Sequence, residues 1–195
     1  MKKDQVEKME SLWAKYEKIL SRFSDENINN LIETFGERIL MCPHSTNQRD
    51  FGSYPGGVVE HSLEVASTMK KINESLNLGV SMSSILKVAL LHEIGKVGDE
   101  DQSLFVTQDS SWHRENLGQN YKYNEKLSKM SVSHRTLYLL QKFNVDLTKD
   151  EWVAIQISGG SHFEENRFYV KSEPALAMLL QKSKSLSILM ASTQE

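Results

Sequence analysis

Apolar side chains recur every three or four positions along most of the chain, which is the spacing of amphipathic α-helices. Two such stripes occupy residues 6–23 and 28–39, the second with Ser24 as its expected N-cap. Further helices are predicted over residues 58–76, from about 83 to a stop at Gly95, and over 133–143. Another should begin at a capping box formed by Thr148 and Glu151, and a last helix should follow Pro174. The pattern predicts an all-α protein.

Residues 97–132 interrupt the helical spacing. They hold an acidic turn, a strand-like Leu-Phe-Val segment and a polar stretch with several aromatic side chains. We expect an irregular insertion here that includes a short β-hairpin. A loop this long inside a compact domain is more often functional than idle.

The chain has 195 residues, a length that fits one domain with a sizeable core. We expect a single domain over residues 1–195. Within it, an N-terminal helical pair, residues 1–42, should pack on a core formed by residues 51–190.

Composition and charge exclude several classes of protein. The 23 Lys and Arg residues nearly balance the 26 Asp and Glu residues, which gives no support for bulk nucleic-acid binding. The single cysteine, Cys42, excludes an internal disulfide and a cysteine-rich zinc site. No signal-peptide core and no membrane-spanning stretch is present in the sequence. We therefore expect a cytoplasmic protein without a membrane partner, or one in the host cytoplasm if a phage encodes it.

Two histidines on predicted core helices are candidates for chemistry. His61 lies one turn into its helix, and His92, followed by Glu93, lies at the end of the next helix. Antiparallel packing of these helices would bring the three side chains together. Two imidazoles and a carboxylate suit a divalent transition metal that activates water. The spacing alone fits ordinary core or surface histidines equally well.

The segments Gly-Gly-Val-Val-Glu-His at 56–61 and Leu-Leu-His-Glu-Ile-Gly-Lys at 90–96 resemble the first two motifs of the HD-domain metal-dependent phosphohydrolases. The similarity extends from about Phe51 to Met190 and is closest to small single-domain bacterial and phage members. It implies an all-α, HD-like helical bundle. It also implies one divalent metal (Mn, Fe, Zn, Ni or Mg) with His61, His92 and Glu93 as ligands.

Three departures from the family pattern weaken that expectation. Glu93 stands in place of the Asp of the His-Asp pair, and Lys184 stands where a late helix usually supplies an Asp that closes the metal site. Ser158-Gly159-Gly160 replaces a further His-Asp-Gly. We therefore expect a degenerate site that holds the ion weakly or not at all. The Lys184 ammonium could occupy the metal's place beside Glu93, or it could extend to solvent.

A degenerate metal site still offers donors and positive charge for a phosphate group. The candidate ligand-binding residues are Lys96, Lys184, Arg49, Arg114 and Tyr121. The alternative for the insertion residues among them is that they simply cover the core. The remaining histidines, His44, His113, His134 and His162, are expected in surface or capping roles. The resemblance implies that many family members recruit extra histidines from the stretch that holds His113 and His134.

Three functions remain open at this point. The first is binding of a nucleotide or other phosphorylated small molecule, with hydrolysis weak or lost. The second is an active phosphohydrolase with Glu93 and Lys96 as catalytic residues. The third is a protein-interaction module, in which the N-terminal helix with Trp13 and Tyr16 serves as a partner or homodimer surface.

Overall fold

A computed structural model describes residues 3–160 and 162–193. The eight labelled α-helices are α1 (Lys3–Leu20), α2 (Glu26–Met41), α3 (Gly57–Leu76), α4 (Met82–Leu91), α5 (Ser111–Leu117), α6 (Val132–Lys142), α7 (Lys149–Gln156) and α8 (Ala175–Ser192). Short 3-10 helices are η1 (Ser21–Phe23), η2 (Ile94–Val97) and η3 (Glu164–Tyr169), and the strands are β1 (Phe105–Thr107) and β2 (Tyr121–Tyr123). The predicted all-α class is confirmed.

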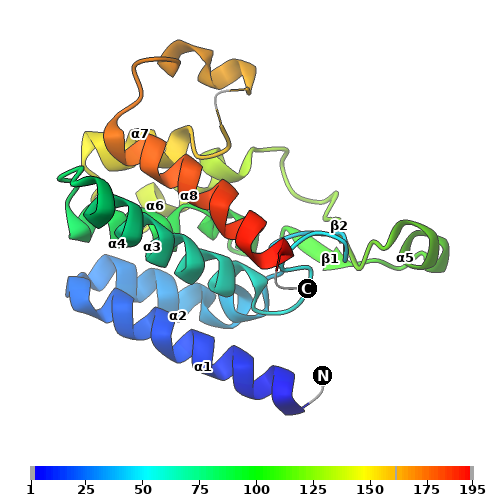
Figure 1. The fold of residues 1–195 in the computed structure, drawn as a ribbon. Coiled ribbons are helices and arrows are strands. Elements are labelled where there is room, and N and C mark those ends of the chain that lie inside the picture. The colour runs from blue at the N-terminus through cyan, green and yellow to red at the C-terminus, as the bar shows by residue number, and fades with distance from the viewer. Residues whose placement is uncertain (1–2, 161, 194–195) are drawn as a thin grey trace.

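The helices form a layered bundle around α3, which packs against α4 on one side and α8 on another. The N-terminal pair α1 and α2 lies below α3 and α4 in Figure 1, and α6 and α7 lie above them. The layers enclose one apolar core, in which the largest fully buried side chains include Phe35, Met69, Ile85, Leu91, Leu139 and Leu140. Burial of each such side chain contributes about 1.5–3 kcal/mol, so this core provides most of the stabilisation.

The helix caps correct one prediction and confirm another. Helix α2 is capped by Asp25, whose carboxylate accepts from the N–H groups of Asn27 and Ile28. Ser24, the predicted cap, instead adopts a left-handed backbone (φ 50°) at the end of η1, so that prediction was wrong. The capping box of Thr148 and Glu151 is present at the start of α7 as predicted.

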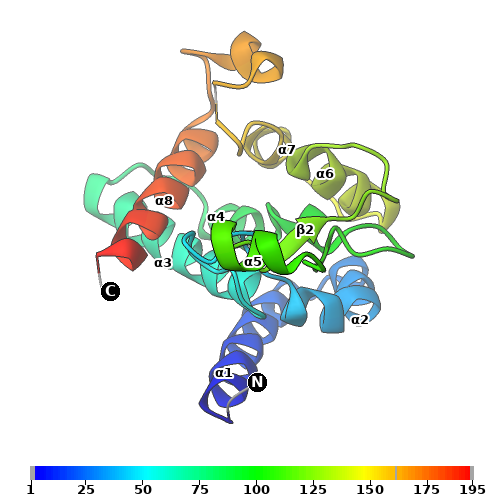
Figure 2. The same ribbon diagram turned by 90° about the vertical axis from the view of Figure 1, so that its right-hand side faces the viewer.

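The insertion leaves the bundle as an arm, visible at the right of Figure 1 and facing the viewer in Figure 2. Its strands β1 and β2 pair antiparallel, with Val106 opposite Lys122, so the predicted hairpin is confirmed. Helix α5 lies between them, capped by the Ser110 hydroxyl, and was not predicted. Its sequence has no apolar stripe, and none of its residues is buried, so the periodicity gave no signal.

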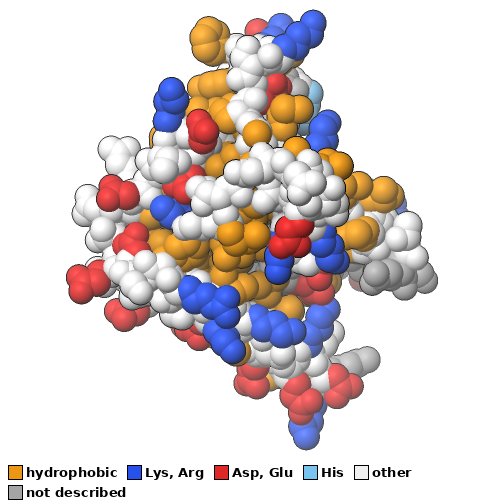
Figure 3. All heavy atoms as spheres, turned by 60° about the vertical axis from the view of Figure 1, so that its left-hand side comes forward, with side chains coloured by type: hydrophobic (Ala, Val, Ile, Leu, Met, Phe, Trp, Pro, Cys, Tyr) orange, Lys and Arg blue, Asp and Glu red, His pale blue; other side chains and the backbone are white. Residues whose placement is uncertain are grey.

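The surface carries exposed apolar side chains among charged ones, as one face shows in Figure 3. Several of them lie on the outer face of α8, namely Met178, Leu186, Ile188, Leu189 and Met190. Of the helices in the described ranges, none combines the length and apolar character that crossing a bilayer requires.

Candidate ligand and metal site

The antiparallel packing of α3 and α4 brings the two motif histidines together. His61 lies near the start of α3, His92 caps the end of α4, and their ring centroids are 6.1 Å apart. Immediately after His92 the chain turns into η2, which places Lys96 three residues beyond Glu93 on the same side of the turn. A short turn of chain therefore presents an imidazole, a carboxylate and an ammonium to one point.

The Glu93 carboxylate forms the centre of this cluster. Its Oε2 atom accepts a hydrogen bond from Lys96 Nζ at 2.8 Å, and its Oε1 atom lies 3.1 Å from Lys184 Nζ. Glu93 is buried, and the Lys184 side chain is 17% exposed. Of the two orientations considered for Lys184, the structure therefore has the one in which the ammonium pairs with Glu93.

His44 joins the cluster from the loop before α3. Its Nε2 atom lies 3.2 Å from Glu93 Oε2, its ring centroid is 4.1 Å from that of His61, and its carbonyl accepts from Lys96 Nζ at 2.9 Å. A surface or capping role was expected for this residue, and that expectation was wrong. His44 belongs to no periodic segment, so only the folded loop reveals its position.

Helix α6 fixes the position of the turn between Glu93 and Lys96. The Thr136 hydroxyl accepts from the N–H of Gly95 at 2.9 Å and donates to the carbonyl of His92 at 3.1 Å. A Cβ atom on Gly95 would lie 2.4 Å from the carbonyl oxygen of Val132, so only glycine permits this close approach. Helix α4 ends at Leu91, so the predicted stop at Gly95 was wrong. Gly95 lies inside η2, where its lack of a side chain allows α6 to pack on the site.

Burial and charge shift the pKa values of the cluster. Burial alone would raise the pKa of Glu93, but Lys96 and Lys184 together hold it well below its usual range. Burial lowers the pKa of His92 to about 3 and that of His61 well below its usual range, so both imidazoles are neutral at pH 7. Burial also lowers the pKa of Lys96, and the Glu93 carboxylate opposes that shift.

Several nitrogens of the cluster have the chemistry of metal ligands. His92 Nδ1 donates to the Ala89 carbonyl at 2.9 Å, which leaves a lone pair on Nε2. That atom and both ring nitrogens of His61 are buried without hydrogen-bond partners among the described residues. Ligand atoms of His44, His61 and Glu93 all lie within 4.8 Å of one another, as a metal site requires.

The two ammonium groups oppose a divalent cation at this point. Both oxygens of Glu93 are already paired with lysine, so an ion that binds the carboxylate must displace or approach both ammonium groups. At an effective dielectric constant of about 20, one ammonium repels a divalent ion about 4 Å away by roughly 8 kcal/mol. The imidazoles fit a metal, whereas the paired carboxylate does not.

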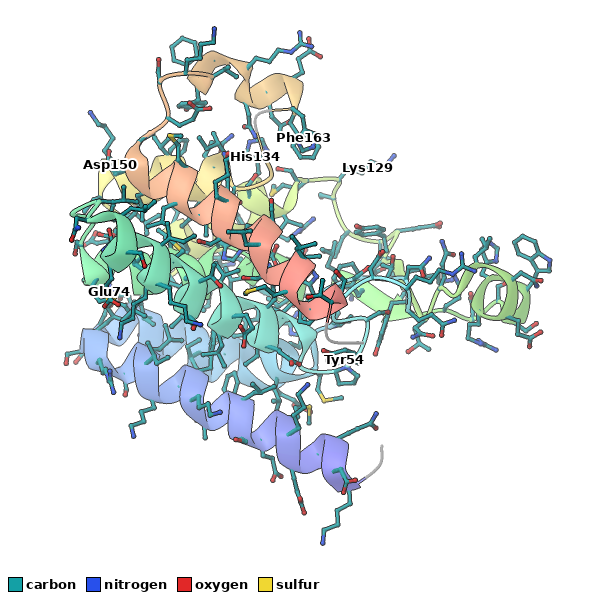
Figure 4. All side chains as sticks on the ribbon, viewed as in Figure 1. Tyr54, Glu74, Lys129, His134, Asp150 and Phe163 are labelled. Carbon is teal, nitrogen blue, oxygen red and sulfur yellow. The ribbon has the colours of Figure 1, made fainter. Side chains whose placement is uncertain are left out.

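A cavity of about 760 Å³ opens beside the cluster. Glu93, Lys96 and Lys184 line it, together with the insertion, the start of α6 and the segment that follows α7. Figure 4 labels two of the lining residues, Lys129 from the insertion and Phe163 from the segment after α7. Its apolar and aromatic lining residues are Leu104, Tyr123, Leu127, Met130, Val132 and Phe163.

Three other predicted ligand-binding residues do not line this cavity. Arg49 is exposed in a separate groove near the end of α8, and Tyr121 lines a pocket on the other side of Lys96. Arg114 lies on the arm, where its Nη1 atom donates to the Gln108 carbonyl at 2.5 Å. The structure brings together His61, His92, Glu93, Lys96 and Lys184. Arg49 and Arg114 lie apart from this cluster, whereas Tyr121 lines a different pocket that Lys96 also borders.

The positions expected to complete the family's site carry other side chains. Ser158 and Gly159 line the cavity where a His-Asp pair was expected. His134 does not reach the cluster, because its Nε2 atom lies 3.0 Å from the amide nitrogen of Gln156. His113 lies on the arm and contacts the Ser110 hydroxyl through Nδ1 at 2.8 Å.

Comparison with known proteins agrees with this architecture. Residues 58–138 match the model of the HD domain family, a range that contains His61, His92 and Glu93 but not Lys184. Searches of curated proteins and of solved structures gave no match. Residues 58–138 are therefore similar to the HD domain family, and the motif positions in α3 and α4 lie within the matched range.

Proposed function

We propose that the cavity binds a phosphorylated small molecule, a nucleotide in particular, and that metal-dependent hydrolysis is weak or lost. The observation that carries this proposal is the pairing of Glu93 with Lys96 on one oxygen and Lys184 on the other. These three groups together carry one excess positive charge. The cluster therefore supplies internally the positive charge that the family obtains from a metal ion.

The same pairing argues against retained hydrolysis. A catalytic metal lowers the pKa of a bound water and so supplies hydroxide near neutral pH. Since the Glu93 carboxylate does not fit a divalent ion without displacement of the lysines, this source of nucleophile is weakened. Ser158 and Gly159 offer no replacement carboxylate or imidazole at their own positions, and Glu165 is the further carboxylate among the cavity's lining residues.

The cavity fits the proposed class of ligand in size and lining. Its volume of about 760 Å³ lies within the range of about 300–1,000 Å³ that is usual for small-molecule sites. Lysine ammonium groups suit the phosphate, and the apolar wall with Tyr123 and Phe163 suits stacking of a nucleobase. These features favour a nucleotide over a free inorganic anion.

Calorimetry in EDTA tests the proposal. Inorganic phosphate and the four ribonucleoside 5′-monophosphates are titrated into the full chain, and we expect at least one nucleotide to bind more tightly than phosphate. Lys184→Gln should weaken that binding about tenfold through loss of an ammonium group in the cavity. Lys182→Gln is the matched control, because it removes an exposed lysine from the same helix. Absence of binding by every probe in EDTA would contradict the proposal.

An active phosphohydrolase is the second candidate, and the unpartnered ring nitrogens of His61 and His92 favour it. In that case His61, His92 and Glu93 would hold the ion, Lys96 would contact the phosphate, and Lys184 would leave Glu93. Release of phosphate from nucleotides in the presence of Mn²⁺, abolished in His92→Ala, would support this candidate over the first.

A further inference from the structure

The start of α6 forms a second positively charged wall of the cavity. It is separate in sequence from the motif residues. Ser131, Val132, Ser133 and Arg135 from this helix line the cavity. Helix α6 has eleven residues, and its N-terminus carries the partial positive charge of the helix dipole. No motif or spacing in the sequence singles out these residues.

Arg135 is the unusual residue on this wall. Its side chain is 3% exposed, and its charge pairs with no carboxylate in the described ranges. Nη2 donates to the Ser128 carbonyl at 2.7 Å, whereas Nε is buried with no hydrogen-bond partner. A buried guanidinium without an anion is costly, which suggests that an anion accompanies it when the cavity is filled.

The backbone beside Arg135 offers further donors. The Ser131 hydroxyl caps only the N–H of His134, and the carbonyl of Ser131 accepts from the N–H of Arg135. The N–H groups of Val132 and Ser133 make no hydrogen bond to another described residue. Free N–H groups at a helix N-terminus are suited to bind phosphate oxygens. The Ser133 hydroxyl, which lies 3.2 Å from the Ser131 hydroxyl, can add another donor if it accepts from Ser131.

We propose that the start of α6 and Arg135 form the seat of the ligand's phosphoryl group. The inference rests on the proposed function and makes it more specific. Phosphate oxygens would accept hydrogen bonds from the Val132 and Ser133 N–H groups and from the Arg135 guanidinium. A planar guanidinium matches the spacing of phosphate oxygens and can bind two of them at once. The ligand is then a phosphomonoester, with its phosphate between the start of α6 and the lysine ammonium groups and its apolar part against the wall with Tyr123 and Phe163.

Titration of the full chain in EDTA with inorganic phosphate, adenosine 5′-monophosphate and adenosine tests the seat. Arg135→Gln should weaken binding of the two phosphate compounds by about tenfold or more. Arg135→Lys should weaken it by less, since lysine keeps the positive charge but cannot make the bidentate hydrogen bonds of a guanidinium. Binding of adenosine should not change. Arg22→Gln is the matched control, because it removes an exposed guanidinium far from the cavity in sequence.

The outcomes separate this inference from the proposed function. If the wild type binds the phosphate compounds and Arg135→Gln binds them equally well, the seat is wrong and the proposed function stands. If the wild type binds neither inorganic phosphate nor any of the four ribonucleoside 5′-monophosphates, the proposed function fails and the seat fails with it.

A second measurement covers the case in which Arg135 variants fold poorly through loss of the bond to Ser128. Amide signals of the wild-type protein are followed by nitrogen–proton NMR as inorganic phosphate is added. We expect the signals of Val132 and Ser133 to shift in proportion to binding. Shifts confined to other residues would place phosphate elsewhere and overturn the inference.

Discussion

Glu93 determines the electrostatics of the site because it neutralises two lysines that lie in poorly solvated positions. Lys96 is buried and hydrogen-bonded to both Glu93 and the His44 carbonyl. Lys184 reaches the same carboxylate from α8, far along the chain. A single side chain therefore ties η2 to the last helix, and its charge matters to stability as well as to binding.

Glu93→Gln should destabilise the protein by about 3 kcal/mol, because it leaves two ammonium groups together without their counter-charge. Urea unfolding followed by circular dichroism measures the change. Glu64→Gln, which removes an exposed carboxylate from α3, should change the free energy of unfolding by less than about 0.5 kcal/mol. Equal effects of the two substitutions would show that Glu93 is not the counter-charge.

The sequence could predict part of this site at the residue level. His61, His92 and Glu93 were recognisable because they stand in helical motifs, and Lys184 because it replaces an expected carboxylate. His44 and Arg135 were not, because their roles depend on how a loop and an insertion pack around the cavity. Arg49, Arg114 and Tyr121 had suitable chemistry but lie outside this cavity.

At the level of elements, the turn η2 depends on α6 for its position. The Thr136 hydroxyl bonds both the N–H of Gly95 and the carbonyl of His92, on either side of Glu93. The glycine allows the backbones to approach, and the hydroxyl satisfies the polar groups that this approach buries.

Thr136→Val should destabilise the protein by about 2 kcal/mol, because the side chain keeps its shape and leaves two buried backbone groups unsatisfied. Thermal unfolding measures the loss. Thr136→Ser keeps the hydroxyl and should recover most of the stability that valine loses. If the serine and valine variants were equally destabilised, the hydroxyl would not be the part of Thr136 that matters.

The sequence predicted helices correctly where apolar residues recur at clear helical spacing, and it predicted a cap correctly where both residues of a capping box are present. Helix α5 did not, because it lies on the arm and buries no apolar face. The cap of α2 was misplaced by one residue, since Ser24 and Asp25 are both good caps and only the backbone of η1 decides between them.

For the whole molecule, the N-terminal helices pack as part of the bundle. Tyr16 of α1 donates its hydroxyl proton to the Leu90 carbonyl at 2.7 Å, two residues before His92. Tyr16 is buried and stacks on Trp13. We propose on these contacts that residues 1–42 and the core unfold together as one domain.

Single-tryptophan variants test this cooperativity. A variant that keeps only Trp13 reports on α1, and one that keeps only Trp152 reports on α7. With phenylalanine at the other positions, we expect each variant's fluorescence and circular dichroism transitions in urea to share one midpoint. A lower fluorescence midpoint for the Trp13 variant would show that the N-terminal pair unfolds separately.

The metal content of the protein tests most directly the claim that lysine has replaced the ion. The full chain is purified without chelator, dialysed against Mn²⁺ and then against metal-free buffer, and measured by elemental analysis. We predict far less than about one ion per chain, and a gain of Mn²⁺ in the Glu93→Asp, Lys184→Asp double variant. About one ion per wild-type chain, lost in His92→Ala, would contradict the account and favour an active phosphohydrolase.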